Sequence, residues 1–258
     1  MYTKQDLVEA LRKSGVSKGD ILFSHSNIGF WGIPQGVSNQ AEMCALVKEA
    51  IFEVIGESGT LCVPSFTYSF GSDKKEKEFN LLESKTSMGI FAEYIRKLPE
   101  SSRSCDPMFS VSAIGKNSQK LLEGEVTECF GKNSFWDRFY RLGGKICNFN
   151  FDSGSTFIHY VEKMLSVPYR KDLNFKGLIV KEDGKRSVSE VKFFCRNLDE
   201  EGTQAKFERF DKIAKEKCSK VVDIGRGQIL VISAEETFAL IQEALINEPY
   251  FLTMKGNE

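Results

Sequence analysis

One amphipathic segment between two short apolar runs constrains the fold more than any other feature. Between Asn39 and Gly56, apolar residues recur at i, i+3, i+4 and i+7, the spacing of a helix with one buried face. Asn39 and Glu42 resemble a capping box, and Gly56 is typical of a helix end. The apolar runs 21–23 and 60–63 flank this helix and are typical of buried strands. The order strand, loop, helix, strand predicts a parallel βαβ unit.

Patterns elsewhere extend an α/β fold along most of the chain. They predict a short helix before Gly15, helices over 87–98 and 156–165, a last helix capped by Ser233 and Glu236, and strands over 111–114, 145–149 and 228–232. Apolar residues on both sides of Glu182–Lys185 predict a β-hairpin, and the mixed run Lys74–Glu78 predicts a solvated loop. We expect one domain over 1–258, with a central mixed, largely parallel sheet flanked by helices and a smaller antiparallel hairpin inserted at about 175–200.

Composition excludes several classes of function. The 258 residues include 35 Lys and Arg against 36 Asp and Glu, so no basic field would attract nucleic acid. The seven cysteines are odd in number and contain no C-x-x-C pair, which argues against a disulfide framework or a zinc ribbon and favours a reducing compartment. The sequence shows neither a signal segment nor an apolar run of about 18 residues, the length a membrane span needs. We therefore expect a soluble, cytoplasmic protein.

The chain has only two histidines, and the second lies in a helical pattern beside an acidic residue. On a helix, His159 and Glu162 share a face at i, i+3, so the carboxylate is able to orient the imidazole. An imidazole with a pKa near 6.5 suits a base that works on an ammonium group at neutral pH. A metal site would need more ligands than this pair, so we expect none. The alternative is a surface pair without a catalytic role.

Two polar loops supply the other candidates. His25 follows the first strand, at the strand end where α/β proteins place ligands, and the loop 24–36 precedes a helix whose N-terminus favours an anionic group. Its spacing matches neither a dinucleotide fingerprint nor a P-loop, and His25 bonding only to the main chain remains the alternative. Arg103 is able to hold a phosphate or carboxylate. Cys105 has no neighbour in sequence that would activate it, so we interpret it as a bystander thiol.

At this point the order of motifs resembles one known family, the aminoglycoside 3-N-acetyltransferases. Five stretches carry the resemblance: Gly19-Asp20 to Ser26; Gly59 to Phe66; Thr86 to Gly89 with Phe91 and Arg96; Arg103-Ser104 with Pro107, Ser110 and Gly115; and Phe151 to Ser153 through Thr156, His159 and Glu162. Ser134, Gly143-Gly144 and Pro168-Tyr169-Arg170 add weaker support. The match runs from about residue 5 to 245, and the five stretches together are far more specific than any one of them.

The resemblance implies an acetyl-CoA-dependent N-acetyltransferase that transfers the acetyl group directly to an amine. It implies that His159, oriented by Glu162, removes the proton from the amine, with Thr156 among the donors that stabilise the developing oxyanion. The residues implied to bind coenzyme A are His25, Ser26, Asn27, Arg103, Ser104 and Ser110. Asp106 and Tyr68 are the expected contacts to the substrate amine.

Three departures from the family pattern bear on the substrate. Asp106 stands where the family often has a histidine, Asn27 where a second serine is common, and Gln35-Gly36 where a glycine pair is usual. Because Asp106 falls on the expected substrate side, we expect the amino group of an amino sugar, nucleotide-linked and used in surface polysaccharide, with an aminoglycoside as the alternative.

Two further alternatives are a non-catalytic protein that retains the coenzyme A pocket and a serine or cysteine hydrolase. The hydrolase is disfavoured because the sequence has no G-x-S-x-G elbow. The expected partner is the small-molecule amine, with no nucleic acid and no membrane, and a homodimer is a further expectation.

Overall fold

The computed structural model describes residues 1–73 and 77–256, which include a central seven-stranded sheet. In spatial order its strands are β4 (Ser102–Arg103), β5 (Val111–Gly115), β2 (Thr60–Pro64), β1 (Ile21–Phe23), β6 (Lys145–Phe149), β10 (Gly227–Ser233) and β9 (Lys220–Ile224). β1 pairs in parallel with both β2 and β6, whereas β5, β4, β10 and β9 join by antiparallel pairing. The predicted mixed sheet is confirmed, with its parallel part confined to the three central strands.

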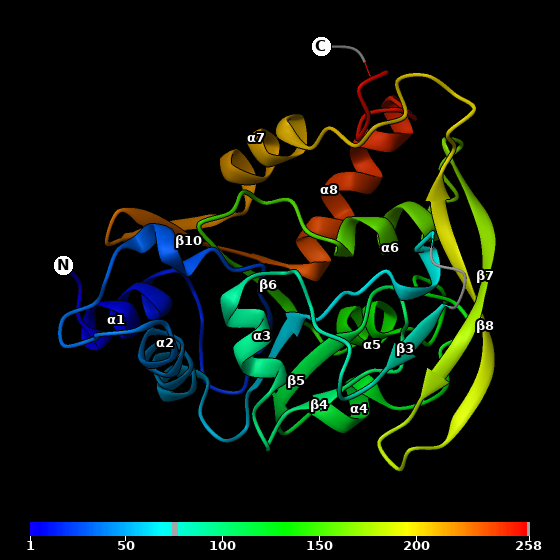
Figure 1. The fold of residues 1–258 in the computed structure, drawn as a ribbon. Helices are drawn as coiled ribbons and strands as arrows, with labels where there is room; N and C mark the ends of the chain where they lie inside the picture. The colour runs from blue at the N-terminus through cyan, green and yellow to red at the C-terminus, as the bar shows by residue number, and fades with distance from the viewer. Residues whose placement is uncertain (74–76, 257–258) are drawn as a thin grey trace.

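Helices cover both faces of this sheet (Figure 1). α1 (Lys4–Lys13), α2 (Gln40–Ile55) and α3 (Ile90–Arg96) contribute to one hydrophobic cluster. α4 (Ser118–Leu122), α5 (Phe135–Arg141), α6 (Phe157–Met164), α7 (Glu208–Lys217) and α8 (Ala234–Asn247) contribute to the other. Along β1, Phe23 belongs to the second cluster and Leu22 to the first. This alternation is expected of a strand that is buried on both faces.

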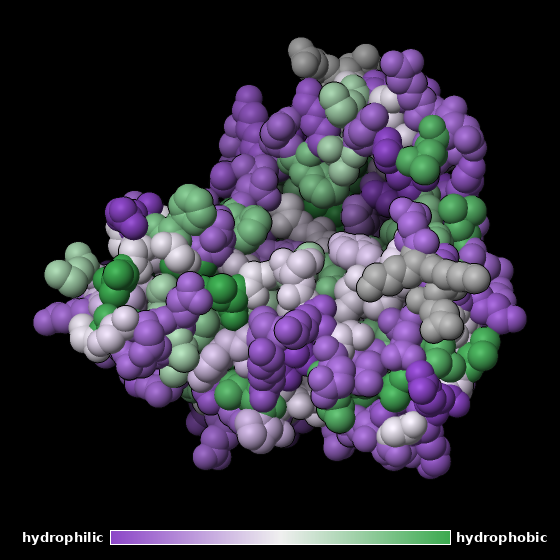
Figure 2. Space-filling model, viewed as in Figure 1, coloured by the Kyte–Doolittle hydropathy of each residue, from purple (hydrophilic) through white to green (hydrophobic). Residues whose placement is uncertain are grey.

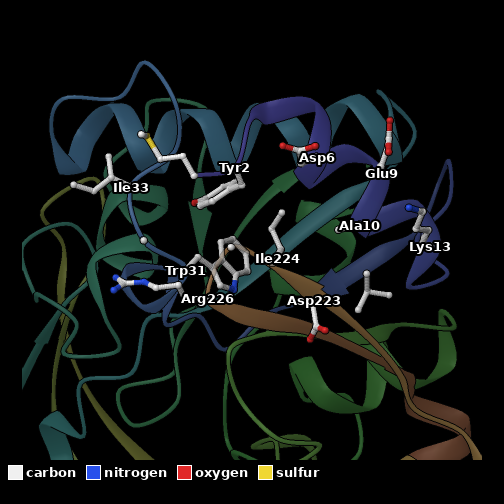
Figure 3. Close-up of a pocket in the computed structure, with 14 residues that line it drawn as sticks. Tyr2, Asp6, Glu9, Ala10, Lys13, Trp31, Ile33, Asp223, Ile224 and Arg226 are labelled. Carbon is white, nitrogen blue, oxygen red and sulfur yellow. The ribbon is translucent and has the colours of Figure 1, made fainter.

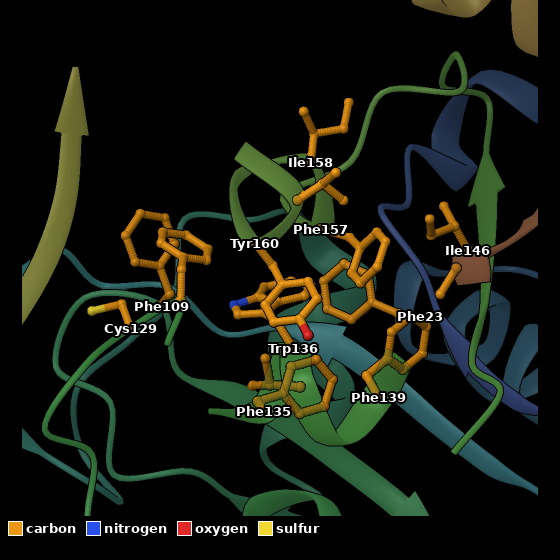
Figure 4. Packing of buried hydrophobic residues seen from close by; sticks show 14 of the residues in the cluster. Phe23, Phe109, Cys129, Phe135, Trp136, Phe139, Ile146, Phe157, Ile158 and Tyr160 are labelled. Atoms are coloured by element: carbon orange, nitrogen blue, oxygen red, sulfur yellow. The ribbon is translucent and has the colours of Figure 1, made fainter. Parts of the chain in front are cut away.

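The second cluster is rich in aromatic rings, and it holds α6 against the sheet (Figure 4). The rings of Phe23 and Trp136 lie 4.9 Å apart, centroid to centroid, and Phe139 lies 6.0 Å from Phe157. Phe157 and Val161 of α6 are fully buried. Because a buried aromatic face leaves a helix little freedom to rotate, the cluster determines which side of α6 faces outward.

A second, three-stranded sheet stands beside the first, in the order β3 (Glu78–Asn80), β7 (Arg170–Val180) and β8 (Arg186–Arg196). β7 and β8 are the predicted hairpin, although the first strand begins at Arg170 rather than near residue 175. β3 pairs in parallel with β7. Glu78 therefore belongs to a strand instead of the solvated loop expected over 74–78, whose residues 74–76 lie outside the described part of the chain.

The βαβ unit β1–α2–β2 forms as predicted, and Asn39 accepts a hydrogen bond from the Glu42 N–H at the start of α2. Helix α3 is shorter than the predicted 87–98, because Gly89 takes a positive φ of 98° just before it. The helices α4, α5 and α7 and the strands β3, β4 and β9 were not predicted. Within the described residues, all seven cysteines are free thiols and no helix is long and apolar enough to cross a membrane.

The capping box at the start of α8 provides a test of the local sequence signals. Ser233 Oγ accepts a hydrogen bond from the Glu236 N–H, and the Glu236 carboxylate accepts one from the Ser233 N–H. Ser233→Ala should lower the free energy of unfolding by about 1 kcal/mol, measured by urea titration, because one helix N–H loses its acceptor. Ser233→Thr keeps a hydroxyl and should recover most of that loss; equal losses in the two variants would contradict the capping role.

Candidate active site

The side chain of Glu162 lies at the centre of a buried hydrogen-bonded cluster. Its Oε2 lies 2.6 Å from His159 Nδ1, and its Oε1 accepts a hydrogen bond of 2.8 Å from the Tyr169 hydroxyl. Arg170 Nε lies 2.6 Å from the same Oε2. The Glu162 side chain is only 1% exposed. A carboxylate removed from water in this way requires such partners, because its desolvation is otherwise uncompensated.

These contacts determine which nitrogen of His159 remains available. Burial alone would raise the pKa of Glu162, but His159, Arg170 and Tyr169 outweigh it and hold the pKa below its usual value. Since the ionised carboxylate can only accept hydrogen bonds, Nδ1 of His159 carries the proton. The other ring nitrogen, Nε2, therefore has the free lone pair that a general base needs.

The imidazole of His159 is poised to stay neutral at physiological pH. Burial lowers its pKa, and the positive charge of Arg170 lowers it further, against the opposing effect of Glu162. The side chain keeps 19% of its surface exposed, and its ring packs between Phe130, at 5.6 Å, and Phe207, at 6.1 Å. Figure 2 shows a hollow in the face of the molecule that Figure 1 views, with apolar residues toward its floor.

The other histidine lies where β1 ends, next to the start of α6. His25 Nε2 is 3.4 Å from the N–H nitrogen of Thr156 and 3.3 Å from its hydroxyl. Burial lowers the pKa of His25 to about 4, so its ring is neutral and Nε2 is able to accept. The structure therefore brings three of the predicted residues to the start of α6: His25 from the loop after β1, and Thr156 and His159 from the helix end itself.

A single buried amide, that of Asn148 at the end of β6, joins the two loops of this region. Its Nδ2 donates to the carbonyl oxygens of Asp152 at 2.7 Å and Gly154 at 2.9 Å. Its Oδ1 accepts a hydrogen bond of 3.3 Å from the His25 N–H. The loop after β1 and the loop before α6 are thus tied together through one fully buried side chain.

The predicted cofactor loop, Ser26 and Asn27, lies beside the N-terminal end of α3. Gly89 has a φ of 98°, and a Cβ on it would lie 3.2 Å from the Ser26 carbonyl oxygen. Gly89 also lines a groove of about 490 Å³ between α2 and α3, together with Gln40, Ser87 and Ile90. The first turn of a helix leaves N–H groups without helical partners, and here that turn faces the groove.

Three other residues predicted to bind the cofactor have their polar groups occupied within the protein. Arg103 donates from Nε to Ser110 Oγ and from its terminal nitrogens to the carbonyl oxygens of Leu81, Ser84 and Ser65, at 2.7–3.2 Å. Ser110 and Ser104 are buried. Four of the five N–H donors of Arg103 are therefore used within the protein, and contacts of these three residues to the cofactor remain a prediction.

The two predicted substrate contacts differ in accessibility. Asp106 is 5% exposed, and its Oδ1 accepts hydrogen bonds from the N–H groups of Met108 and Phe109. Its carboxylate therefore holds a turn, and a contact between Asp106 and the substrate remains a prediction. Tyr68 is 41% exposed, packs against Phe66 and Phe109, and takes a left-handed φ of 51°, so a contact between Tyr68 and the substrate remains a prediction.

Other features of the described residues do not add chemistry to this site. They contain no group of three or more His, Cys, Asp or Glu side chains placed to hold a metal ion. Burial raises the pKa of the Cys105 thiol, in keeping with a bystander. A cavity of about 780 Å³, between α1 and the β9–β10 hairpin, has neither histidine in its lining (Figure 3). Tyr2, Trp31 and Arg226 line it.

The sequence analysis did not predict that Tyr169 and Arg170 contact Glu162. Both belonged to the weaker Pro168-Tyr169-Arg170 motif, which was the one available signal. The chain reverses after α6 through Ser166, which has a positive φ of 54°, and returns along β7 so that both side chains reach the carboxylate. Nothing in their local pattern predicts this reversal.

The fold and this site define an α/β acyltransferase, and comparison with known proteins gives the family. The family model for aminoglycoside 3-N-acetyltransferase matches residues 35–246, and the chain belongs to that family. It is 28% identical to the SPbeta prophage-derived aminoglycoside N(3')-acetyltransferase-like protein YokD of Bacillus subtilis, with 95% of this chain and 93% of YokD covered. It is 25% identical to aminoglycoside N(3)-acetyltransferase III of Acinetobacter baumannii, covering 72% and 68%.

Solved structures confirm the fold. The structure of AAC-IIIb with CoASH has a TM-score of 0.78 at 17% identity, covering 95% of this chain and 97% of that one. AAC-VIa bound to sisomicin has a TM-score of 0.78 at 22% identity, with the same coverage. The predicted enzyme class, an N-acetyltransferase, and the predicted cofactor, acetyl-CoA, are confirmed as those of the family.

The hydrogen bonds of Arg103 give a test of its structural role. Arg103→Lys should lower the free energy of unfolding by about 2–4 kcal/mol, because an ammonium cannot reach all four acceptors and leaves carbonyl oxygens unpaired. Arg12→Lys, at an exposed position of α1, is the control and should change stability by no more than about 0.5 kcal/mol. A wild-type urea transition for Arg103→Lys together with a raised KM for acetyl-CoA would show that Arg103 binds the cofactor instead.

Proposed function

We propose that this chain transfers the acetyl group of acetyl-CoA to an amino group of an aminoglycoside-type amino sugar, with His159 as the general base. The observation that carries the proposal is the imidazole of His159, which is bonded through Nδ1 to a buried carboxylate and keeps Nε2 free. Among the described residues, no protein group is hydrogen-bonded to that nitrogen. A base with a lowered pKa and a free lone pair suits removal of a proton from an ammonium group near neutral pH.

The cofactor supplies an activated acetyl group in the form of a thioester. We propose that the Ser26-Asn27 loop and the first turn of α3 at Gly89 hold its chain along the groove. Lys97, which lines that groove and pairs with Glu93 at 3.2 Å, is the cation there that we assign to a phosphate. The same loop contains His25, which contacts Thr156 at the start of α6, and this continuity supports a path from the groove toward His159.

The remaining steps belong to the residues of α6. His159 takes the proton from the amine, and Glu162 stabilises the imidazolium that forms, as a carboxylate does beside a catalytic histidine. Thr156 lies three residues before His159 and just ahead of an eight-residue helix, where the helix dipole favours negative charge. Its hydroxyl, which lies 3.3 Å from His25 Nε2, is the donor that we assign to the oxyanion, and it must turn from that nitrogen to reach it.

Two observations favour an aminoglycoside over the nucleotide-linked amino sugar expected from the sequence. The family description names aminoglycosides, and AAC-VIa, which shares the fold, is bound to sisomicin. The preference for another substrate rested on Asp106, whose carboxylate is buried and bonded to the main chain. That departure from the family pattern therefore no longer argues against an aminoglycoside.

Free-thiol release from acetyl-CoA, followed by mass spectrometry of the products, tests the proposal with two sets of amines, aminoglycosides and nucleotide-linked amino sugars. Aminoglycosides should be acetylated, and His159→Ala should lower the turnover number by a factor of about 10²–10⁴ with the fold intact. Turnover of nucleotide-linked amino sugars alone would contradict the assigned substrate. Wild-type activity in His159→Ala would contradict the assignment of His159 as the base. Binding of acetyl-CoA without thiol release from any amine would favour a non-catalytic protein.

The lowered pKa of His159 predicts the pH dependence of kcat/KM. Because the base must be neutral, the acid limb of kcat/KM should appear as the pH falls through the pKa of His159, which lies below 6.5. The alkaline limb should follow the pKa of the substrate amine and move when the amine is changed. An acid limb at or above pH 6.5, or one that moves with the amine, would contradict the assignment.

A further inference from the structure

The carboxylate of Glu162 has two partners besides His159, the Tyr169 hydroxyl and the Arg170 guanidinium, and the second of them is a cation. Oε2 is shared between His159 Nδ1 and Arg170 Nε, each at 2.6 Å. The side chains of Glu162 and Arg170 are 1% and 7% exposed. Among the described residues, Arg170 Nε has no hydrogen-bond acceptor in good alignment, so the contact is an ion pair more than a directed hydrogen bond.

The charge of this cluster changes the chemistry of the imidazole. Beside a lone buried carboxylate, protonation of His159 would form a neutral ion pair and would be favoured. With Arg170 in place, Glu162 and Arg170 already neutralise one another, and a proton on His159 would leave a net positive charge in a poorly solvated site. The imidazole is therefore held in the form that accepts a proton.

We propose that Arg170 is a positioning residue that keeps His159 unprotonated by neutralising Glu162, and that Tyr169 orients the carboxylate for it. The inference rests on the proposed function only in calling His159 the base. Tyr169 donates to Oε1 at 2.8 Å, which leaves Oε2 facing the imidazole and the guanidinium. Arg170 is itself anchored, because its NH1 donates to the Phe194 carbonyl oxygen of β8 at 3.2 Å.

Other ionisable groups around the imidazole are neutral or paired elsewhere. They are Glu128 and Asp172, both within 3.1 Å of Lys163; Cys195 and Cys129, whose thiols burial keeps protonated by raising their pKa; and His25, whose ring is neutral. The groups that shift the pKa of His159 besides burial are Arg170, which lowers it, and Glu162, which raises it. Arg170 is thus the cation to test.

The experiment is a titration of histidine side chains by NMR in protein labelled at histidine. The chain has only two histidines, and His159→Gln identifies the second by loss of its signal. In the wild type the His159 midpoint should lie below pH 6.5. In Arg170→Gln it should rise by about one unit or more, the shift expected when an opposing charge within contact distance is removed. Arg170→Lys should lie closer to the wild type than Arg170→Gln does.

Arg96→Gln is the matched control for the titration. The Arg96 side chain is also 7% exposed and also pairs with a glutamate, Glu93, but neither group contacts His159. Its loss should leave the His159 midpoint unchanged. Arg170→Met, which keeps the length of the apolar stem, is the second variant if Arg170→Gln does not fold.

Kinetics separates this inference from the proposed function. In Arg170→Gln the acid limb of kcat/KM should move to higher pH by the same amount as the NMR midpoint. The decrease in kcat/KM relative to the wild type should therefore be larger at pH 6 than at pH 9. An unshifted His159 midpoint in folded Arg170→Gln or Arg170→Met overturns the inference, as does an equal shift in Arg170→Lys and Arg170→Gln. If no amine is acetylated by the wild type, the proposed function fails while the titration still decides the role of Arg170.

Discussion

The site depends on one ionised carboxylate that is almost completely removed from water. Glu162 would be a costly residue in this position without the imidazole, the phenol and the guanidinium that surround it. The three partners come from two elements, α6 and the start of β7, so the carboxylate is satisfied only when both are in place. The second sheet thereby contributes Arg170, at the start of β7, to a site whose His159 and Glu162 lie on α6, a helix packed against the first sheet.

Packing, rather than polar contacts, sets the direction in which His159 points. The buried face of α6 carries Phe157 and Val161 into the aromatic cluster above the central sheet. One helical residue turns the side-chain direction by about 100°, so a helix fixed by these rings also fixes the direction of the side chain at position 159. The unusual number of phenylalanines is in this sense part of what positions the proposed base.

The sequence was most informative where the relevant contacts are local. The His159–Glu162 pair lies within one helical turn, and the βαβ unit lies in one continuous stretch, so spacing alone predicts both. Helix α7 was missed because it buries only Phe210 and Ala214, too few residues for an apolar stripe. Burial was the other limit. Residue type suggested a ligand contact for Arg103 and Asp106, but Arg103 donates to the distant Ser65 carbonyl oxygen and Asp106 accepts from the nearby Phe109 N–H.

The amide of Asn148 gives the two sides of the proposed site a common mechanical link. Its oxygen holds the backbone at His25, on the side assigned to the cofactor, and its nitrogen holds the carbonyls of Asp152 and Gly154, ahead of the helix that carries the base. A displacement of either loop must stretch a bond to the same rigid, planar group. The two loops therefore share one buried anchor, the side chain of Asn148.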